Sequence, residues 1–240
     1  MKYFLLSVAL GLSTLVQAQE VIHTVKDPNA ERRKVGSFTS IQAEGGLDIY
    51  VTQGNEYGVA VSASSEEFRD AIVTEVRGNT LYLAFKYKYG WKNGMSNPKA
   101  KAYVSIDKLE SINVSGACDI HIAGVLKSDD LKVVVSGASC IKGEVQLNNA
   151  QFLMTGASDC KLRGSAEKIK VQVSGASSFK GYDMNSGDAE INASGASDVQ
   201  MNITNSLAVE ATGASSVHYK GEPRLKGIRV TGASSFSRKS

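Results

Sequence analysis

Proline is scarce in this sequence, and helical periodicity is missing from it. Among 240 residues there are 3 prolines and 1 tryptophan, and apolar residues do not recur at the three- and four-residue spacing of an amphipathic helix. This pattern excludes a helical bundle. Beyond residue 18 no apolar stretch reaches the roughly 18 residues that a spanning helix needs, so we expect no transmembrane segment.

Cysteine and net charge are also low, which limits the function classes. A net charge of +3 is too small to indicate nucleic acid as a partner. Cys118, Cys140 and Cys160 are an odd number and fit a disulfide framework poorly, so we expect free, mostly packed thiols. There is no metal-ligand spacing, no nucleophile elbow and no phosphate loop. The sequence predicts no cofactor, no metal and no catalytic residue.

The first residues have the composition of a secretory signal peptide. Lys2 precedes an apolar run from Phe4 to Val16, and Ala18 offers a small-residue cleavage site. We therefore expect residues 1–18 to be a signal peptide, 19–36 a polar leader and 37–240 a single domain. The chain is expected to be exported, to the periplasm, the medium or the cell surface.

A nine-residue segment such as VSGASCIKG (135–143) recurs seven times. The glycines of the seven copies are 21, 19, 19, 20, 18 and 19 residues apart, and they are Gly116, Gly137, Gly156, Gly175, Gly195, Gly213 and Gly232. A fixed period of this size indicates a solenoid. Apolar residues four and two before each glycine, and four after it, indicate strands with one face inward. The sequence predicts stacked parallel strands over residues 41–236, in coils of roughly 19 residues.

Small residues surround each repeated glycine. We expect the glycine to permit a bend, the following Ala to pack inside a narrow corner, and the preceding Ser or Thr to satisfy corner amides. Each coil should then close through a return loop such as 127–130. Residues 41–51 overlay on 112–122, and further strands are expected around Val59, Leu83 and Val104. The gap from Gly45 to Gly116 leaves room for three to four coils.

Several of these segments resemble a known family. They are Phe38-Thr39-Ser40-Ile41, Gly46-Leu47-Asp48 with the following Ile49 to Gly54, the serial Ser/Thr-Gly-Ala-Ser corners, and Val217 to Pro223. The chain resembles the auto-transporter adhesin head domain called GIN, found in exported proteins of Gram-negative bacteria, although the Gly-Ile-Asn signature reads Gly-Leu-Asp here. The resemblance implies a right-handed parallel β-helix with an adhesive or binding role, and it carries over no catalytic residue.

Three lysines occupy one outward position on consecutive coils. Lys142, Lys161 and Lys180 each follow a repeat glycine by five residues, so they should stack at about 4.8 Å. An anionic polymer along this row would offset their repulsion, although neighbouring acids such as Asp159 could neutralise it instead. The acids three residues after the glycines fall on alternate coils, about 9.6 Å apart, which is too far to share a calcium ion.

The segment KYKYGWKNGMSNPKAK (86–101) departs from the repeat. Its aromatic and basic residues alternate, and the candidate ligand-binding residues among them are Lys86, Tyr87, Lys88, Tyr89, Trp91 and Lys92. Loops on a rigid scaffold often carry binding residues. Aromatic faces suit sugar rings, and ammonium groups suit acidic sugars. The alternative is an edge hairpin whose lysines block strand addition.

The sequence therefore predicts an exported, non-catalytic binding domain. Its expected ligand is an envelope or extracellular polysaccharide, or a cell-surface protein. Two other functions stay open: a polysaccharide-degrading β-helix enzyme, and a purely structural envelope component. Self-association through coil ends or edge strands is a further expectation.

Overall fold

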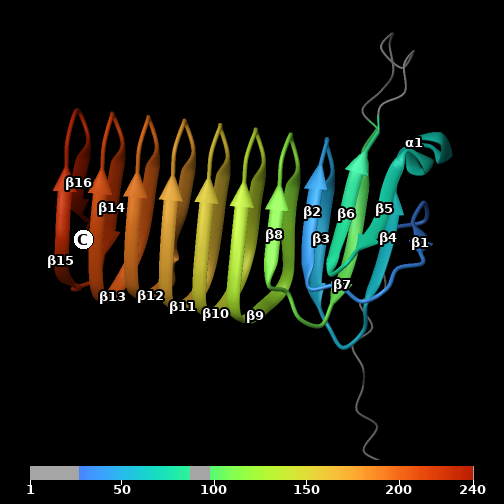
Figure 1. Ribbon diagram of the computed structural model, residues 1–240, viewed down its shortest axis with the longest axis horizontal. Helices are drawn as coiled ribbons and strands as arrows, with labels where there is room; N and C mark the ends of the chain where they lie inside the picture. The colour runs from blue at the N-terminus through green and yellow to red at the C-terminus, as the bar shows by residue number, and fades with distance from the viewer. Residues whose placement is uncertain (1–26, 87–97, 240) are drawn as a thin grey trace, which may run out of the picture.

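The chain folds into a β-solenoid of about 7 turns, 66% strand and 2% helix, shown in Figure 1. The computed structural model describes residues 27–86 and 98–239. Its strands are β1 (Glu31–Arg33), β2 (Ser40–Glu44), β3 (Asp48–Gln53), β4 (Gly58–Ser62), β5 (Ile72–Arg77), β6 (Thr80–Phe85), β7 (Lys101–Ile106), β8 (Ser111–Val114), β9 (Asp119–Val135), β10 (Cys140–Met154), β11 (Asp159–Val173), β12 (Ser178–Ala193), β13 (Asp198–Ala211), β14 (Ser216–Lys220), β15 (Arg224–Val230) and β16 (Ser235–Arg238), and its helix is α1 (Glu66–Asp70).

The regular coils are built from long strands that pair in parallel with the coil before and the coil after. β10 pairs with β9 on one side and with β11 on the other along nearly its full length. The predicted parallel β-solenoid is thereby confirmed. The expected return loop 127–130 is wrong, because these residues belong to β9 and its wide bend keeps the pairing of Lys127 with Gln146.

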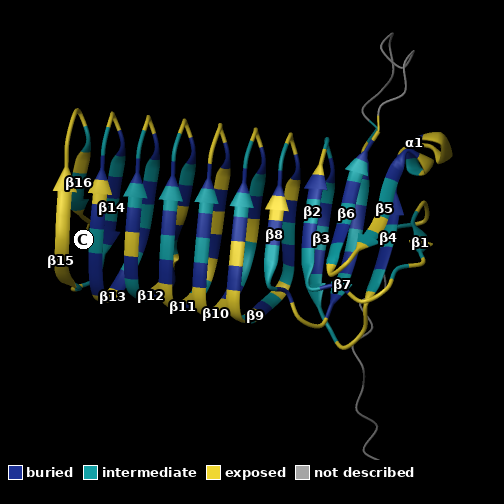
Figure 2. Cartoon of the chain, in the orientation of Figure 1, coloured by how far each residue is buried: buried dark blue, intermediate teal, exposed yellow. Residues whose placement is uncertain are grey.

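The solenoid interior is filled by the predicted apolar rows. Four residues before the first five repeat glycines lie Ile112, Val133, Phe152, Val171 and Ile191, all with 0% exposure, and four before the sixth lies Val209, with 4%. Phe152 and Phe179 also meet edge to face at 5.2 Å. Because each coil buries these side chains only against its neighbours, the core is a continuous column between the two sheets, drawn dark blue in Figure 2.

The repeated corners differ from the expectation in one respect. Gly156 has a φ of +81°, which glycine adopts at little cost, and its carbonyl accepts a hydrogen bond from the Ala176 amide at 2.8 Å. Ala176 itself is exposed, while Ser177 is buried. The prediction that Ala packs inside the corner is therefore wrong. The backbone bend turns Ala outward and brings the next residue inward.

The buried corner serines form a hydrogen-bonded ladder. Ser177 Oγ accepts from the Ser158 amide at 3.2 Å and lies 3.2 Å from Ser158 Oγ. In the preceding coils Ser139 Oγ accepts from the Cys118 amide at 3.2 Å. Serine hydroxyls thus accept hydrogen bonds from corner amides, as expected. The serine that does so follows the Ala, however, whereas the expected one precedes the glycine.

The N-terminal part is not a series of parallel coils. β2 lies between β6 and β8, and β3 lies between β7 and β9. The coil of Gly45 thus stacks directly on that of Gly116, and the intervening chain adds strands outside it. β4 pairs antiparallel with β7, and β5 pairs antiparallel with β6. The expectation of three to four parallel coils in this gap is therefore wrong.

The outer N-terminal edge carries a short helix, α1, and a strand, β1. Only β1 comes from the expected leader. α1 begins after Ser65, whose Oγ accepts from the Phe68 amide at 3.3 Å, as N-cap residues do. β1 pairs antiparallel with β4. No helix in the described parts of the chain has the length and apolarity to cross a membrane.

Candidate functional site

One row of outward side chains runs along the sheet that contains β3 and β7. The pairing registers place its members side by side in the order Tyr103, Tyr50, His121, Lys142, Lys161 and Lys180. We call this row the aromatic–lysine stripe. At about 4.8 Å per coil it spans about 24 Å. The three predicted lysines are thus brought together, and three rings continue their row.

The rings of the stripe are stacked on one another. The Tyr50 ring lies 5.2 Å from that of Tyr103, with 20° between their planes. On its other side it lies 4.8 Å from the His121 ring, with 12° between the planes. Both faces of Tyr50 are therefore covered, and its edge and hydroxyl are directed outward.

Carboxylates lie beside this ring stack: Asp27 at Tyr103, and Asp48 and Asp119 near His121. The edge of an aromatic ring is the electropositive part of its quadrupole. Burial lowers the pKa of His121, and the charge of Lys142 lowers it further, so the imidazole is neutral at neutral pH. The Tyr103 hydroxyl donates to Asp27 Oδ2 at 2.8 Å. That bond fixes the ring at the end of the stack.

The lysines of the stripe have few partners of opposite charge. Lys180 Nζ lies 3.8 Å from Asp159 Oδ1, a pair between exposed groups that contributes little. Among the described residues, Lys142 and Lys161 form no ion pair within 4.0 Å. Neutralisation by Asp159 therefore reaches one lysine, on the next coil, and leaves the other two able to bind an anion.

The predicted segment 86–101 is described only at its two ends. Five of its candidates, Tyr87, Lys88, Tyr89, Trp91 and Lys92, lie outside the described residues, while Lys86 is exposed directly after β6. Phe85, which ends β6, lies beside the Gly45 corner. β7 then begins at Lys101 and carries Tyr103 in the stripe. The described chain on either side of residues 87–97 therefore lies at the Gly45 corner and in the strand that carries Tyr103.

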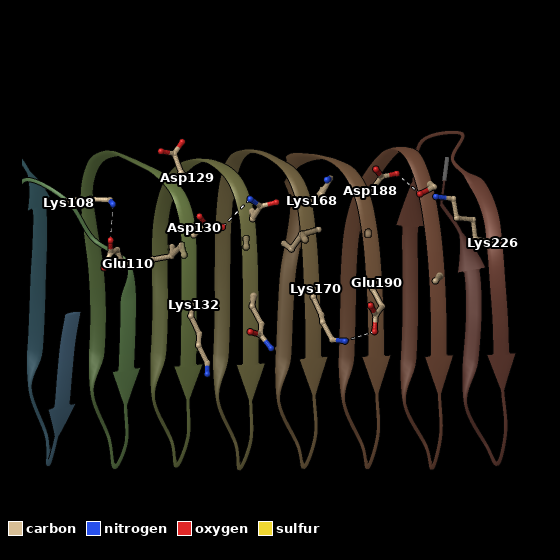
Figure 3. A pocket seen from close by; sticks show the side chains of 18 residues that line it. Lys108, Glu110, Asp129, Asp130, Lys132, Lys168, Lys170, Asp188, Glu190 and Lys226 are labelled. Carbon is tan, nitrogen blue, oxygen red and sulfur yellow. Dashed lines mark hydrogen bonds and ion pairs between the residues drawn. The ribbon is translucent and has the colours of Figure 1, made fainter. Parts of the chain in front are cut away.

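A shallow groove of about 670 Å³ lies over the opposite sheet, and its residues are shown in Figure 3. Five lysines and five acids line the groove, and two of the lysines form ion pairs with its acids. Lys170 meets Glu190 at 2.7 Å and Lys108 meets Glu110 at 2.8 Å, while Asp130 accepts from Asn149 at 3.0 Å. Because its acids equal its lysines in number, the groove is a weaker candidate for an acidic ligand than the stripe.

Two kinds of catalytic site are not formed by the described residues. Between 27–86 and 98–239, no three His, Cys, Asp or Glu side chains are placed to hold a metal ion. His218 Nδ1 lies 2.8 Å from Ser237 Oγ, but within this part of the chain no carboxylate hydrogen-bonds to His218. Such an orienting group is part of serine catalysis.

The three thiols are free, as predicted. Cys118 and Cys160 are buried and Cys140 is half-buried. Burial raises the pKa of each, most strongly that of Cys160. The thiols are therefore poor nucleophiles at neutral pH.

Sequence reasoning missed Tyr50 and Tyr103 as parts of the site. The overlay of residues 41–51 on 112–122 already places Tyr50 in the column of His121, and that alignment could have found it. Tyr103 had no such signal, because it joins the row only through the pairing of β7 with β3.

Comparison with known proteins gives a family and a fold. The family described as "Putative auto-transporter adhesin, head GIN domain" matches residues 37–223. Among curated proteins, no sequence matches significantly. A structure named "putative adhesin" from Bacteroides fragilis is 23% identical with a TM-score of 0.80, and the match covers 88% of this chain and 96% of that one.

Two further solved structures are similar. A "putative lipid binding protein" from Parabacteroides distasonis is 20% identical with a TM-score of 0.63, covering 89% of this chain and 98% of that one. A "putative adhesin" from Parabacteroides merdae is 15% identical with a TM-score of 0.64, covering 88% and 95%. At these identities the likeness shows the fold alone.

Proposed function

The chain belongs to the head GIN domain family of auto-transporter adhesins, and we propose that it is an exported, non-catalytic binding domain for an acidic polysaccharide of the envelope or the extracellular space. The aromatic–lysine stripe carries this proposal. It presents ring edges, one tyrosine hydroxyl with no hydrogen-bond partner among the described residues, and three ammonium groups in one line, on a scaffold that fixes their spacing.

The chemistry of the stripe matches a polymer with repeated acid groups. Ammonium groups that repeat at about 4.8 Å attract successive carboxylates or sulfates, and the attraction is screened by salt. The Tyr50 hydroxyl can bond a sugar hydroxyl, and the electropositive ring edges continue the attraction. The covered ring faces make stacking of sugars along the middle of the stripe a poor fit.

The 86–101 loop is proposed as an extension of the same site. Tyr87, Tyr89 and Trp91 supply aromatic surface, and Lys86, Lys88 and Lys92 supply charge. Removing Tyr89 and Trp91 together should weaken binding and leave the melting temperature nearly unchanged, because these residues do not belong to the coil repeat. A loss of stability without a loss of binding would contradict this extension.

Binding of polygalacturonate tests the stripe directly, with neutral dextran as the control polymer. In the double variant K142Q/K161Q, loss of two exposed charge contacts should weaken binding by about 2- to 30-fold. The matched control K132Q/K168Q removes two lysines from the opposite groove and should bind as wild type.

Three outcomes would overturn the proposal. Equal weakening in both double variants would mean that only net charge matters. Equal binding of dextran would show that acid groups are not recognised. If the chain adheres to intact cells but to neither polymer, the cell-surface protein named among the expected ligands is the better candidate.

A further inference from the structure

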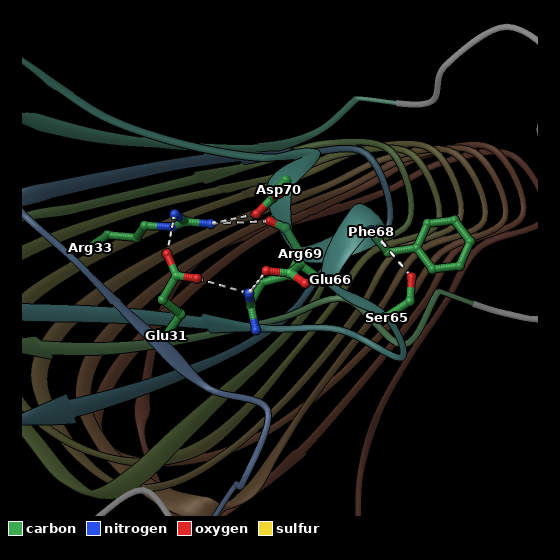
Figure 4. Close-up of polar contacts among 7 residues, drawn as sticks. All are labelled: Glu31, Arg33, Ser65, Glu66, Phe68, Arg69 and Asp70. Carbon is green, nitrogen blue, oxygen red and sulfur yellow. Dashed lines mark hydrogen bonds and ion pairs between the residues drawn. The ribbon is translucent and has the colours of Figure 1, made fainter.

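The two ends of the solenoid are finished differently. At the N-terminal end, α1 and β1 cover the first coil, and Phe68 of α1 is 5% exposed. Figure 4 shows the ion pairs that tie these elements together. Glu31 bridges Arg33 at 2.6 Å and Arg69 at 3.0 Å. This end therefore offers no open parallel coil.

At the C-terminal end the last coil, residues 224–239, has no described residue above it. Every residue of β15 is exposed. By register with β13, Leu225, Ile228 and Val230 continue the inward rows of Leu207, Val209 and Ala211, yet they are 48%, 38% and 38% exposed. Core positions are thus open to solvent at this end, as the yellow β15 in Figure 2 shows.

The backbone of this coil is also unpaired on its outer side. In the coil below, the Gly213 carbonyl accepts from the Ala233 amide at 2.8 Å. The corresponding Gly232 carbonyl has no such donor in the part of the chain that the structure describes. An open edge of this kind is a template for another strand.

The charge of the last coil selects the partner. Residues 224–239 contain five basic residues and no acid: Arg224, Lys226, Arg229, Arg238 and Lys239. Arg229 pairs with Glu210 at 3.7 Å and Arg238 with Glu222 at 2.9 Å, both in the coil below. The other three form no ion pair among the described residues. The surface therefore combines an apolar inner row with a basic outer row.

We propose that this open coil binds an acidic polypeptide segment by β-strand addition. The segment would alternate apolar residues, which cover Leu225, Ile228 and Val230, with Asp or Glu opposite the basic row. A second copy of the chain fits less well, because its last coil would bring five further basic residues against these five. Like charges directly opposite across paired strands are destabilising.

A synthetic peptide provides the probe. It has the sequence of residues 224–239 with all five basic residues replaced by Glu, so it keeps the apolar row and reverses the charge. The unaltered 224–239 peptide is the matched control. With the purified chain, we expect the acidic peptide to bind at least about tenfold more tightly than the control, measured by fluorescence anisotropy. Binding should weaken as salt is raised.

Variants of the full chain locate the contact. R224E/K226E should weaken binding of the acidic peptide, whereas K142Q/K161Q, on the stripe, should leave it unchanged. Far-UV circular dichroism of R224E/K226E checks that the fold is kept, because both side chains are exposed. As an independent test, Gly227→Pro should also prevent binding of the acidic peptide, because proline distorts the edge strand β15 without altering its charge.

Several results would overturn the inference. Equal affinity for the two peptides would mean that charge does not select the partner. Loss of binding in K142Q/K161Q would place the peptide on the stripe instead. Dimers of the chain alone in sedimentation velocity that disappear in R224E/K226E would make a second copy the occupant. Polygalacturonate binding is measured in its own assay with K142Q/K161Q against K132Q/K168Q, so the two proposals can fail separately.

Discussion

The stacked glycine corners make the sharpest prediction about stability. Gly156 and Gly124 both have a φ of +81°, but their surroundings differ. A Cβ on Gly156 would lie 2.6 Å from the Gly137 carbonyl oxygen and 3.0 Å from its amide nitrogen, whereas a Cβ on Gly124 would meet nothing within 4 Å. Replacing each glycine with alanine therefore separates backbone strain from the close stacking of coils.

The expected magnitudes follow from this geometry. In both variants alanine adopts a positive φ, at about 1–2 kcal/mol. In G156A the clash adds about 1–3 kcal/mol of overpacking, because Gly137 O accepts the Ala157 amide at 2.8 Å and cannot move without weakening that bond. For a chain of this size, G156A should melt about 2–12 °C below G124A.

Thermal and urea unfolding followed by far-UV circular dichroism measure this difference. Coincident transitions in both variants are needed, because solenoids can lose cooperativity. If G156A and G124A melt together, the corners do not stack closely enough to exclude a methyl group. Close stacking of the corners would then not be the reason that glycine recurs at each of them.

Three further predictions concern other parts of the chain. Ala176→Leu should change the free energy of unfolding by no more than about 0.5 kcal/mol because Ala176 is exposed, whereas Ser177→Ala should cost about 1–3 kcal/mol by leaving a buried amide unpaired; the reverse order in urea titrations would contradict the corner geometry. In the native chain a thiol reagent should label Cys140 alone, because the other two thiols are buried, and labelling of all three before unfolding would be inconsistent with this packing. Burial raises the pKa of Asp27, but hydrogen bonds from Tyr103 and Ser62 more than offset it, so this pKa lies below its ordinary value of 3.8. The resulting stability is present above that value and is lost as pH falls through the folded pKa. Y103F should therefore be less stable than wild type at neutral pH, with a gap that narrows below pH 3.8, and a gap of constant size in urea midpoints would exclude this linkage.

The repeat by itself determined the architecture of the regular coils. Seven glycines at a nearly fixed period, with apolar residues two apart, leave one way to bury the inner face, which is stacking on the next coil. The free thiols and the row of Lys142, Lys161 and Lys180 followed from the same columns. Each of these depends on position within one repeat, and sequence records that position directly.

The tertiary structure decided what depends on pairing between distant segments. It showed that β2 and β3 stack directly on β8 and β9, that β4 and β5 run antiparallel, and that Tyr103 joins Tyr50 and His121. No copy of the repeat covers β4, β5 or Tyr103, so nothing in the sequence signals how they pair. Sequence could not orient the corner Ala either. Which small residue faces inward depends on the backbone angle of Gly156 and its neighbours, and Gly, Ala and Ser are all small enough to be consistent with either orientation.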